Sequence, residues 1–229
     1  MTESSSVSSV VTAALPLQSV SRPERRLAPP EAGLEAGTDR AQATGDASCE
    51  RHASDGAVTV VDDMFDASVQ ASIAQLLERP KWSFTGGTPQ ARFWHMDHLE
   101  DEAFFSTTLL ALIRNRLGSQ LRPSVDVVRI YANGQTASQS GSPHTDDGDV
   151  TLVYFSNLHW RPEWEGSLAF EDGDFGRVEY TPNRLVVFPA RLKHFATAPS
   201  KHYAGMRVSL TFKLQVQVRQ QASSFVSRA

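Results

Sequence analysis

The residues best suited to chemistry lie between positions 141 and 155, in the stretch "GSPHTDDGDVTLVYF". A Gly-Ser-Pro turn leads into His144 and Asp146, and a long apolar run follows them. Imidazole and carboxylate groups bind first-row metal ions, and residues two apart on a strand point to one face of a sheet. The spacing therefore suits a metal site, although surface polar residues that close a loop have the same pattern.

The pattern His-x-Asp occurs twice, so its context has to decide. His144 and Asp146 stand at the entrance of a β-rich run, and His194 follows another β-rich run, "RLVVFPARLKH". His95 and Asp97 instead precede the acidic stretch "HLEDEAFF", where we expect no strand to anchor them. Two histidines and one carboxylate on one face of a metal ion leave the opposite face open for other ligands. We therefore favour His144, Asp146 and His194 over any set that includes His95 and Asp97.

A candidate anion site follows in "MRVSLTFKL", where Arg207 and Ser209 share one face of a predicted strand. Arginine binds a carboxylate through two parallel hydrogen bonds, and a buried arginine is costly without an anionic partner. A dicarboxylate ligand would be such a partner. Considered alone, Arg207 more commonly pairs with an aspartate or glutamate of the protein.

The composition limits the partners. The chain has 229 residues, a formal net charge of −4 and scattered lysines and arginines, so we expect no nucleic acid partner. Cys49 is the only cysteine, which excludes an intrachain disulfide and a thiolate cluster and suits a cytoplasmic location. No apolar run approaches the roughly 18 residues that cross a bilayer, so we expect no membrane partner. The oligomeric state stays open.

The elements that must position these residues begin after an N-terminal leader. The first aromatic residue is Phe65, and residues 1–55 are rich in Ser, Ala, Glu, Pro, Gly and Arg, which predicts a disordered leader. We predict one folded domain over residues 56–217 and a tail over residues 218–229. The run "AVTVVDDMF" predicts an edge strand, and Asp66 predicts the N-cap of a helix that Pro80 ends. A second helix is expected from about Ser106 to Gly118.

From residue 123 onward the sequence predicts short strands. Segments such as "SVDVVRIYA", "DVTLVYFS", "NRLVVFPA" and "MRVSLTFKLQVQV" alternate with Asn-Gly, Asp-Gly and Thr-Pro-Asn turns. The fold class is therefore mainly β with flanking helices: a double-stranded β-helix (jelly roll) preceded by two α-helices. We expect both apolar helix faces to pack against a sheet.

The order "HTD", then a distant His, then "RVS", on strands after two helices, resembles the iron(II)- and 2-oxoglutarate-dependent dioxygenases. It is most similar to the small bacterial members akin to prolyl 4-hydroxylases. The likeness extends over about residues 57–215 and includes "VVDDMF", "YANGQ" and "YFSNLHWRPEWEGSLAF". One departure is Glu165, since relatives commonly have Trp-Gly-Gly at this point.

The resemblance implies that His144, Asp146 and His194 bind Fe(II), and that 2-oxoglutarate and O2 are co-substrates, with ascorbate as a further reductant. It assigns the distal carboxylate of 2-oxoglutarate to Arg207, with Ser209 as a second donor and Tyr131 as a further cofactor-binding residue. Arg129 is a weaker candidate for this carboxylate, and Gln135 is a candidate for the mouth of the site. Related halogenases have Gly or Ala in place of the metal-binding aspartate, so Asp146 implies hydroxylation, desaturation or cyclisation.

The predicted function is hydroxylation of an unactivated C–H bond of a small molecule, such as an amino acid or a biosynthetic intermediate, with release of succinate and CO2. A peptidyl or protein prolyl hydroxylase is the main alternative. A cupin-like metalloenzyme without a keto acid and a non-catalytic jelly-roll binding module are alternatives of other kinds. We expect the substrate to enter through loops around residues 82–100 and 158–176.

Overall fold

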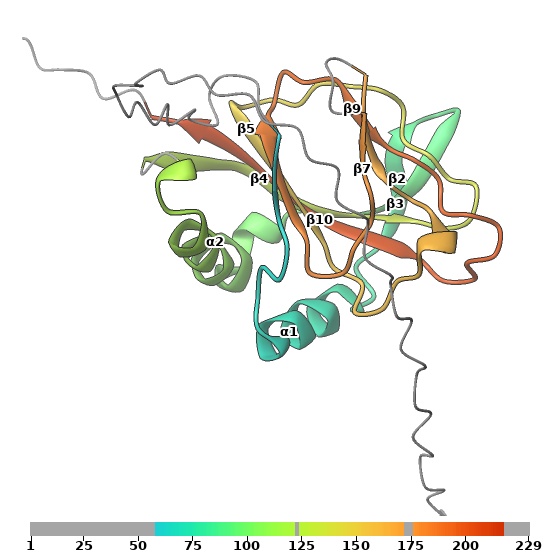
Figure 1. Ribbon diagram of the computed structural model, residues 1–229, viewed down its shortest axis with the longest axis horizontal. Coiled ribbons are helices and arrows are strands. Elements are labelled where there is room, and N and C mark those ends of the chain that lie inside the picture. Colours follow the sequence, from blue (N-terminus) through green and yellow to red (C-terminus); the bar gives the residue numbers. More distant parts are fainter. Residues whose placement is uncertain (1–57, 122–123, 172–175, 218–229) are drawn as a thin grey trace, which may run out of the picture. The chain divides into compact units, whose positions relative to one another are not determined.

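The computed structural model describes residues 58–121, 124–171 and 176–217. The predicted leader (1–55) and tail (218–229) lie outside these residues. Two antiparallel sheets dominate the domain, and this confirms the predicted fold class (Figure 1). The larger sheet contains, in spatial order, β1 (Thr59–Val61), β8 (Leu185–Pro189), β5 (Val150–Phe155), β10 (Arg207–Val216), β4 (Val125–Gln135), β3 (Ala91–Met96) and β2 (Ser83–Thr88). The smaller sheet contains β7 (Arg177–Val178), β6 (Leu168–Phe170) and β9 (His194–Ala196).

Two α-helices cover one face of the larger sheet, as the sequence predicts (Figure 1). Helix α1 (Ala67–Leu77) begins at Asp66, whose carboxylate accepts the backbone N–H groups of Ser68 and Val69, both at 2.9 Å. Helix α2 (Leu110–Leu117) ends at Gly118, where φ is 53°. A π-helical segment, Phe104–Leu109, leads into α2 and was not predicted. The other helical turns in the described part of the chain are the short 3-10 segments Leu99–Asp101, Gly118–Gln120 and Pro162–Trp164.

Strand β10 shows how the sequence divides the two faces of the larger sheet. Leu210, Phe212 and Leu214 are fully buried on the helix side. The alternate residues Arg207, Ser209, Thr211 and Lys213 therefore face the smaller sheet. A second, smaller core of aromatic and aliphatic side chains fills the space between the sheets; it contains Val153, Phe155, Leu168, Phe170, Tyr180, Val186 and Phe188.

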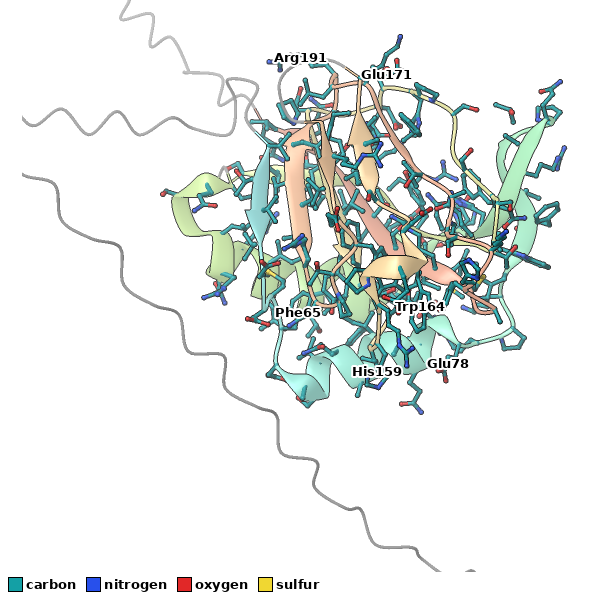
Figure 2. All side chains as sticks on the ribbon, turned by 45° about the vertical axis from the view of Figure 1, so that its right-hand side comes forward. Phe65, Glu78, His159, Trp164, Glu171 and Arg191 are labelled. Atoms are coloured by element: carbon teal, nitrogen blue, oxygen red, sulfur yellow. The ribbon has the colours of Figure 1, made fainter. Side chains whose placement is uncertain are left out.

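The edge of the helix-side core lies where the chain enters α1. Figure 2 shows Phe65 at this entrance, and its ring meets the ring of Tyr154 edge-on at 5.1 Å. Asn183 closes the same corner, because it accepts the Phe65 N–H at 3.0 Å and donates to the Phe65 carbonyl at 2.9 Å. These contacts fix β1 beside β8 at the edge of the larger sheet, and the predicted edge strand is confirmed. No helix among the described residues has both the length and the apolar character to cross a membrane.

The prediction for residues 82–100 was wrong, because strands β2 and β3 form a hairpin there instead of a loop. His95 therefore does lie on a strand, contrary to the expectation from "HLEDEAFF". The signal was weak because β2 contains Gly86 and Gly87, residues that are disfavoured in strands. The ring of Phe93 packs in the space that a side chain at position 86 would occupy. This packing offsets the low strand propensity of the glycines.

Candidate metal centre and adjoining cavity

The three predicted ligands come together because two distant segments are joined through their backbones. His144 and His194 form an isolated antiparallel bridge, with reciprocal N–H to carbonyl distances of 3.1 and 2.9 Å. His194 is the first residue of β9, and Asp146 lies between the bridge and β5. The Asp146 N–H donates to the Ala190 carbonyl at 2.8 Å, so the backbone is held on both sides of the group.

The side chains of this group point at one another. His144 Nε2 lies 3.6 Å from Asp146 Oδ1, and His194 Nε2 lies 3.4 Å from Asp146 Oδ2. Ligand atoms of the three residues lie within 4.8 Å of one another. Bonds of about 2.1 Å to a shared ion would place adjacent ligands about 3 Å apart. A small inward movement of the three side chains would therefore accommodate a metal ion.

The ring nitrogens of both histidines are oriented for metal binding. His144 Nδ1 contacts the Ser142 carbonyl at 2.8 Å, and His194 Nδ1 contacts the Leu192 carbonyl at the same distance. A carbonyl only accepts hydrogen bonds, so each Nδ1 must carry the proton. Each Nε2 then presents its lone pair to Asp146 and to the space between the rings, which is the arrangement that metal-binding histidines adopt.

Asp146 is kept charged although its side chain is only 1% exposed. Burial raises the pKa of its carboxyl group, but the contact with His194, the hydrogen bond from Thr151 and the nearby charge of Lys213 outweigh burial and bring the pKa below its usual range. Thr151 Oγ1 donates to Oδ2 at 2.7 Å, and Lys213 Nζ lies 3.1 Å from Oδ1. Oδ1 nevertheless has no well-directed hydrogen bond. A cation is therefore suited to this oxygen.

Strands β4 and β10 place two rows of polar side chains beside the three predicted metal ligands. The register pairs Lys213 with Arg129, Thr211 with Tyr131, Ser209 with Asn133 and Arg207 with Gln135. The end of the rows at Lys213 adjoins Asp146, and the other end lies deep between the sheets at Arg207. The predicted cofactor-binding residues Tyr131, Ser209 and Arg207 thus lie along one line that starts at the predicted metal ligands.

Arg207 is fully buried, yet no carboxylate in the described parts of the chain forms an ion pair with it. Its Nε donates to the Gly166 carbonyl at 2.6 Å, and its Nη1 donates to Gln135 Oε1 at 3.0 Å. Nη1 also approaches Ser209 Oγ at 3.5 Å, whereas Nη2 has no hydrogen-bond partner among the described residues. Burial lowers the pKa of Arg207 to about 10. An unpaired N–H group on a buried cation favours an anionic ligand at this position.

An unusual turn supports Arg207. Glu165 has φ 56° and ψ −137°, and Gly166 has φ 79°. Residues with a side chain rarely tolerate the first conformation, whereas glycine, which has no Cβ atom, adopts it readily. A Cβ atom at Gly166 would lie 2.9 Å from Arg207 Cδ, so only glycine fits against the arginine. Glu165 therefore leaves the turn intact but adopts a conformation that suits glycine.

A cavity of about 520 Å³ opens beside the predicted metal ligands. Its wall includes the predicted residues His144, Asp146, Tyr131, Arg129 and Gln135, and also Thr85, Gly86, Gly87, Thr88, Phe93, His95, Asp97, Asn133, Gly141, Ser142, Pro143, Ala196 and Lys213. Residues of the segment 82–100 contribute to this wall, whereas none of the described residues in 158–176 does so, and the entry route of a substrate stays a prediction. Gln135 is only 1% exposed and binds Arg207, so its predicted place at the mouth was wrong.

Two features of this region were missed from the sequence. Lys213 contacts the carboxylate of Asp146, and its position could have been found by continuing the alternation from Arg207 along "RVSLTFK". The cluster of His95, Asp97 and Arg129 required the pairing of β3 with β4, which the sequence did not predict.

The two sheets and the two flanking helices, with His144, Asp146 and His194 at one end of the strands, define a double-stranded β-helix of the kind found in 2-oxoglutarate–Fe(II) oxygenases. No protein-family model matches the chain, and no curated protein does. Among solved structures, a Trichoplax adhaerens prolyl hydroxylase in complex with a peptide fragment of hypoxia inducible factor aligns at a TM-score of 0.54 and 16% identity, over 69% of this chain and 83% of that one. A Pseudomonas putida prolyl-4-hydroxylase aligns at 0.51 and 15% identity, over 72% and 95%.

A third similar structure is HygX from Streptomyces hygroscopicus with nickel and 2-oxoglutarate bound, at a TM-score of 0.55 and 12% identity, over 70% of this chain and 83% of that one. Identities this low establish the shared fold. The chemistry of this chain has to be argued from its own residues.

Proposed function

We propose that this protein is an Fe(II)- and 2-oxoglutarate-dependent oxygenase in which His144, Asp146 and His194 hold the iron. The observation that carries the proposal is the convergence of two Nε2 lone pairs and one charged carboxylate beside a cavity whose wall includes His144 and Asp146. Three protein ligands on one face of an ion leave positions for a bidentate co-substrate and dioxygen. The solved structures of this fold that contain metal and 2-oxoglutarate support the same assignment.

We assign the distal carboxylate of 2-oxoglutarate to Arg207, with Ser209 and Tyr131 as further donors. The unpaired, buried Nη2 of Arg207 supports this assignment. Burial raises the pKa of Tyr131, so its phenol stays protonated and can donate a hydrogen bond. Gln135 separates the cavity from Arg207, and we expect its side chain to move when the carboxylate binds.

When bound, the iron, the keto acid and dioxygen would together supply the oxidation of an unactivated C–H bond, with dioxygen as the oxidant and succinate and CO2 formed from the keto acid. The residues of this chain supply the geometry. Thr151 and Lys213 hold Asp146, and the Ser142 and Leu192 carbonyls fix the two imidazole rings. Phe155 and Tyr180 exclude water around Arg207, which strengthens its attraction for an anion. The aspartate at position 146 favours hydroxylation, desaturation or cyclisation over halogenation.

The substrate we propose is a small molecule such as an amino acid or a biosynthetic intermediate. A cavity of about 520 Å³ is within the usual range for small-molecule sites. A peptidyl prolyl substrate is the second candidate, because one structure of this fold contains a bound peptide. We also propose a cytoplasmic location, since Cys49 is the only cysteine, and ascorbate as a reductant that keeps the iron ferrous.

The test is anaerobic addition of Fe(II) and then 2-oxoglutarate to metal-free protein, with the weak visible metal-to-ligand charge-transfer band as the readout. We expect a band in the parent, no band in His144→Ala, and an unchanged band in the control His159→Ala, whose side chain lies outside the cavity. Arg207→Ala should need more 2-oxoglutarate than Arg207→Lys. Absence of the band in folded, iron-loaded parent protein would overturn the proposal and favour a non-catalytic module or another metal chemistry.

A further inference from the structure

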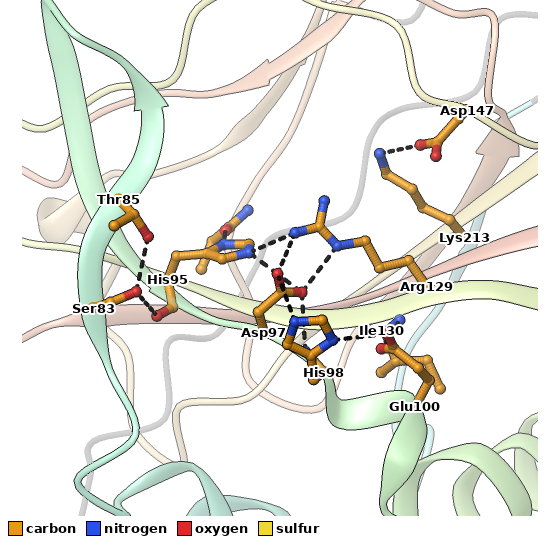
Figure 3. A network of polar contacts seen from close by, with 11 residues as sticks. Ser83, Thr85, His95, Asp97, His98, Glu100, Arg129, Ile130, Asp147 and Lys213 are labelled. Atoms are coloured by element: carbon orange, nitrogen blue, oxygen red, sulfur yellow. Dashed lines mark hydrogen bonds and ion pairs between the residues drawn. The ribbon is translucent and has the colours of Figure 1, made fainter.

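A cluster of polar side chains lines the cavity beneath the β2–β3 hairpin, away from the predicted metal ligands. Arg129 Nε and Nη2 donate to the two carboxylate oxygens of Asp97 at 2.9 and 2.6 Å. His95 lies between this ion pair and Asn133, and Figure 3 shows the imidazole in contact with both the guanidinium and the carboxylate. All four side chains border the cavity that also contains His144 and Asp146. None of them is used in the function proposed above.

The hydrogen bonds within the cluster fix its orientation. Arg129 Nη2 can only donate, and it lies 3.3 Å from His95 Nε2, so Nε2 must accept. His95 Nδ1 then carries the proton and donates to Asn133 Oδ1 at 2.8 Å. Burial lowers the pKa of His95, which agrees with a neutral ring. Two donor groups at the cavity wall, Arg129 Nη1 and Asn133 Nδ2, form no hydrogen bond with any residue that the structure describes.

Asp97 supplies the complementary acceptor. The hydrogen bonds from Arg129 lower its pKa to about 2, so it is a carboxylate at neutral pH. Its side chain is 31% exposed. Oδ1 already accepts from Arg129 Nε and from the His98 N–H, both at 2.9 Å, whereas Oδ2 accepts from Arg129 Nη2 and can accept a further hydrogen bond. The cavity wall thus presents a cation and an anion side by side, held rigid by two mutual bonds. Such a preformed pair loses little conformational entropy when a ligand binds.

The ligand that satisfies both groups must carry opposite charges close together. A simple carboxylate would approach Asp97 unfavourably, and a simple amine would approach Arg129 unfavourably. A free α-amino acid has a carboxylate for Arg129 Nη1 and Asn133 Nδ2 and an ammonium group for Asp97. The register sets Arg129 opposite Lys213, whose Nζ lies 3.1 Å from Asp146, so the ligand's remaining atoms would lie beside the predicted metal ligands.

We propose that the cluster of His95, Asp97, Arg129 and Asn133 is the subsite that binds the α-carboxylate and α-ammonium groups of a free amino acid substrate. The inference rests on the proposed oxygenase function for its meaning as a substrate site. Its binding test, however, needs neither iron nor turnover. His95 acts as a positioning residue, because it orients the amide of Asn133 and the guanidinium of Arg129.

The chain offers a matched control for the ion pair. Arg184 and Asp62 form the same two-point contact, at 2.6 and 2.9 Å, outside the cavity. Arg184→Gln removes an equivalent pair without touching the proposed subsite. Asp97→Asn keeps the size of the side chain and removes its charge, and Arg129→Gln removes the charged guanidinium group. Far-UV circular dichroism establishes that each variant is folded before binding is measured.

The experiment is calorimetric titration of the metal-free protein with each of the 20 proteinogenic L-amino acids. We then titrate the N-acetyl and α-amide derivatives of those that bind. At least one free amino acid should bind, and both derivatives should bind about tenfold to 100-fold more weakly, the loss expected for one charged hydrogen-bonded contact. Arg129→Gln should show a similar loss for the free amino acid, and Arg184→Gln should bind like the parent.

Two results would overturn the subsite. One is the absence of binding by all 20 amino acids, and the other is equal binding of the free and N-acetylated forms. The charge-transfer experiment separates this failure from failure of the proposed function. A charge-transfer band without amino acid binding would support the proposed oxygenase function and overturn the subsite. Amino acid binding without a band would support the subsite as a binding site and overturn the oxygenase function.

Discussion

The ion pair between Asp97 and Arg129 makes a measurable contribution to stability that depends on pH. The pKa of Asp97 falls from its ordinary 3.8 to about 2 because Arg129 donates two hydrogen bonds to the carboxylate. A tenfold change in proton affinity equals about 1.4 kcal/mol, so the full effect is about 2.4 kcal/mol. The Asp97 and Arg129 side chains are 31% and 40% exposed, and solvent screening reduces the effect to about 1–2 kcal/mol.

Proton linkage gives the direction in which the stability contribution of Asp97 changes with pH. A carboxylate whose pKa is lowered in the folded state stabilises that state above its unfolded pKa, and this contribution is lost as the pH falls through the folded pKa. Asp97→Asn should therefore lower the free energy of unfolding by about 1–2 kcal/mol at pH 7. The difference from the parent should shrink between pH 3.8 and about 2.

The assay is urea unfolding followed by tryptophan fluorescence at pH 7, 5, 4 and 3, with both proteins free of metal. Asp62→Asn is the control, because Arg184 also lowers the pKa of Asp62, but this aspartate is more exposed and should contribute less. The reasoning would be refuted if Asp97→Asn were as stable as the parent at pH 7. A deficit that stays constant down to pH 3 would also contradict it, since the loss would then be one of packing.

Three further predictions concern the surroundings of the predicted metal ligands. Glu165→Gly should raise the free energy of unfolding by about 1 kcal/mol in urea titrations, because glycine adopts a φ of 56° without strain. Lys213→Met should destabilise the metal-free protein by about 2–4 kcal/mol and the Mn(II)-loaded protein by less, measured by thermal unfolding, because a bound metal replaces the lost cation beside Asp146. Thr151→Val should weaken Mn(II) binding by about tenfold or more in calorimetry, since it removes the hydroxyl that orients Asp146; unchanged affinity would contradict this.

Much of the fold could be predicted from local sequence patterns. The alternation of Leu210, Phe212 and Leu214 with polar residues predicted β10, and the Asp66 cap predicted the start of α1. The β2–β3 hairpin was missed because Gly86 and Gly87 interrupt its pattern. Its strands are stabilised by pairing with β4, a contact between distant segments that local propensity does not contain.

In the candidate site, too, local sequence patterns predicted some residues, whereas residues brought in by strand pairing were missed. The sequence was enough to select His144, Asp146 and His194, and the structure brings them together, although their role as ligands stays a prediction. Lys213 and the Asp97–Arg129 pair depend on strand register, which one sequence does not determine. The partners of Arg207 were also hidden, because Gln135 lies 72 residues away in the chain.

The backbone bridge between His144 and His194 has a consequence for folding. These residues are 50 positions apart, and the segment between them contains β5, β6, β7 and β8. An ion bound to both rings would close this segment into a ring, as a covalent crosslink does. Closing a loop of this length removes about 4 kcal/mol of unfolded-chain entropy in the simplest polymer treatment. The ion would therefore crosslink a segment that contains four of the ten described strands, and loss of metal would loosen the smaller sheet as well as the proposed catalytic centre.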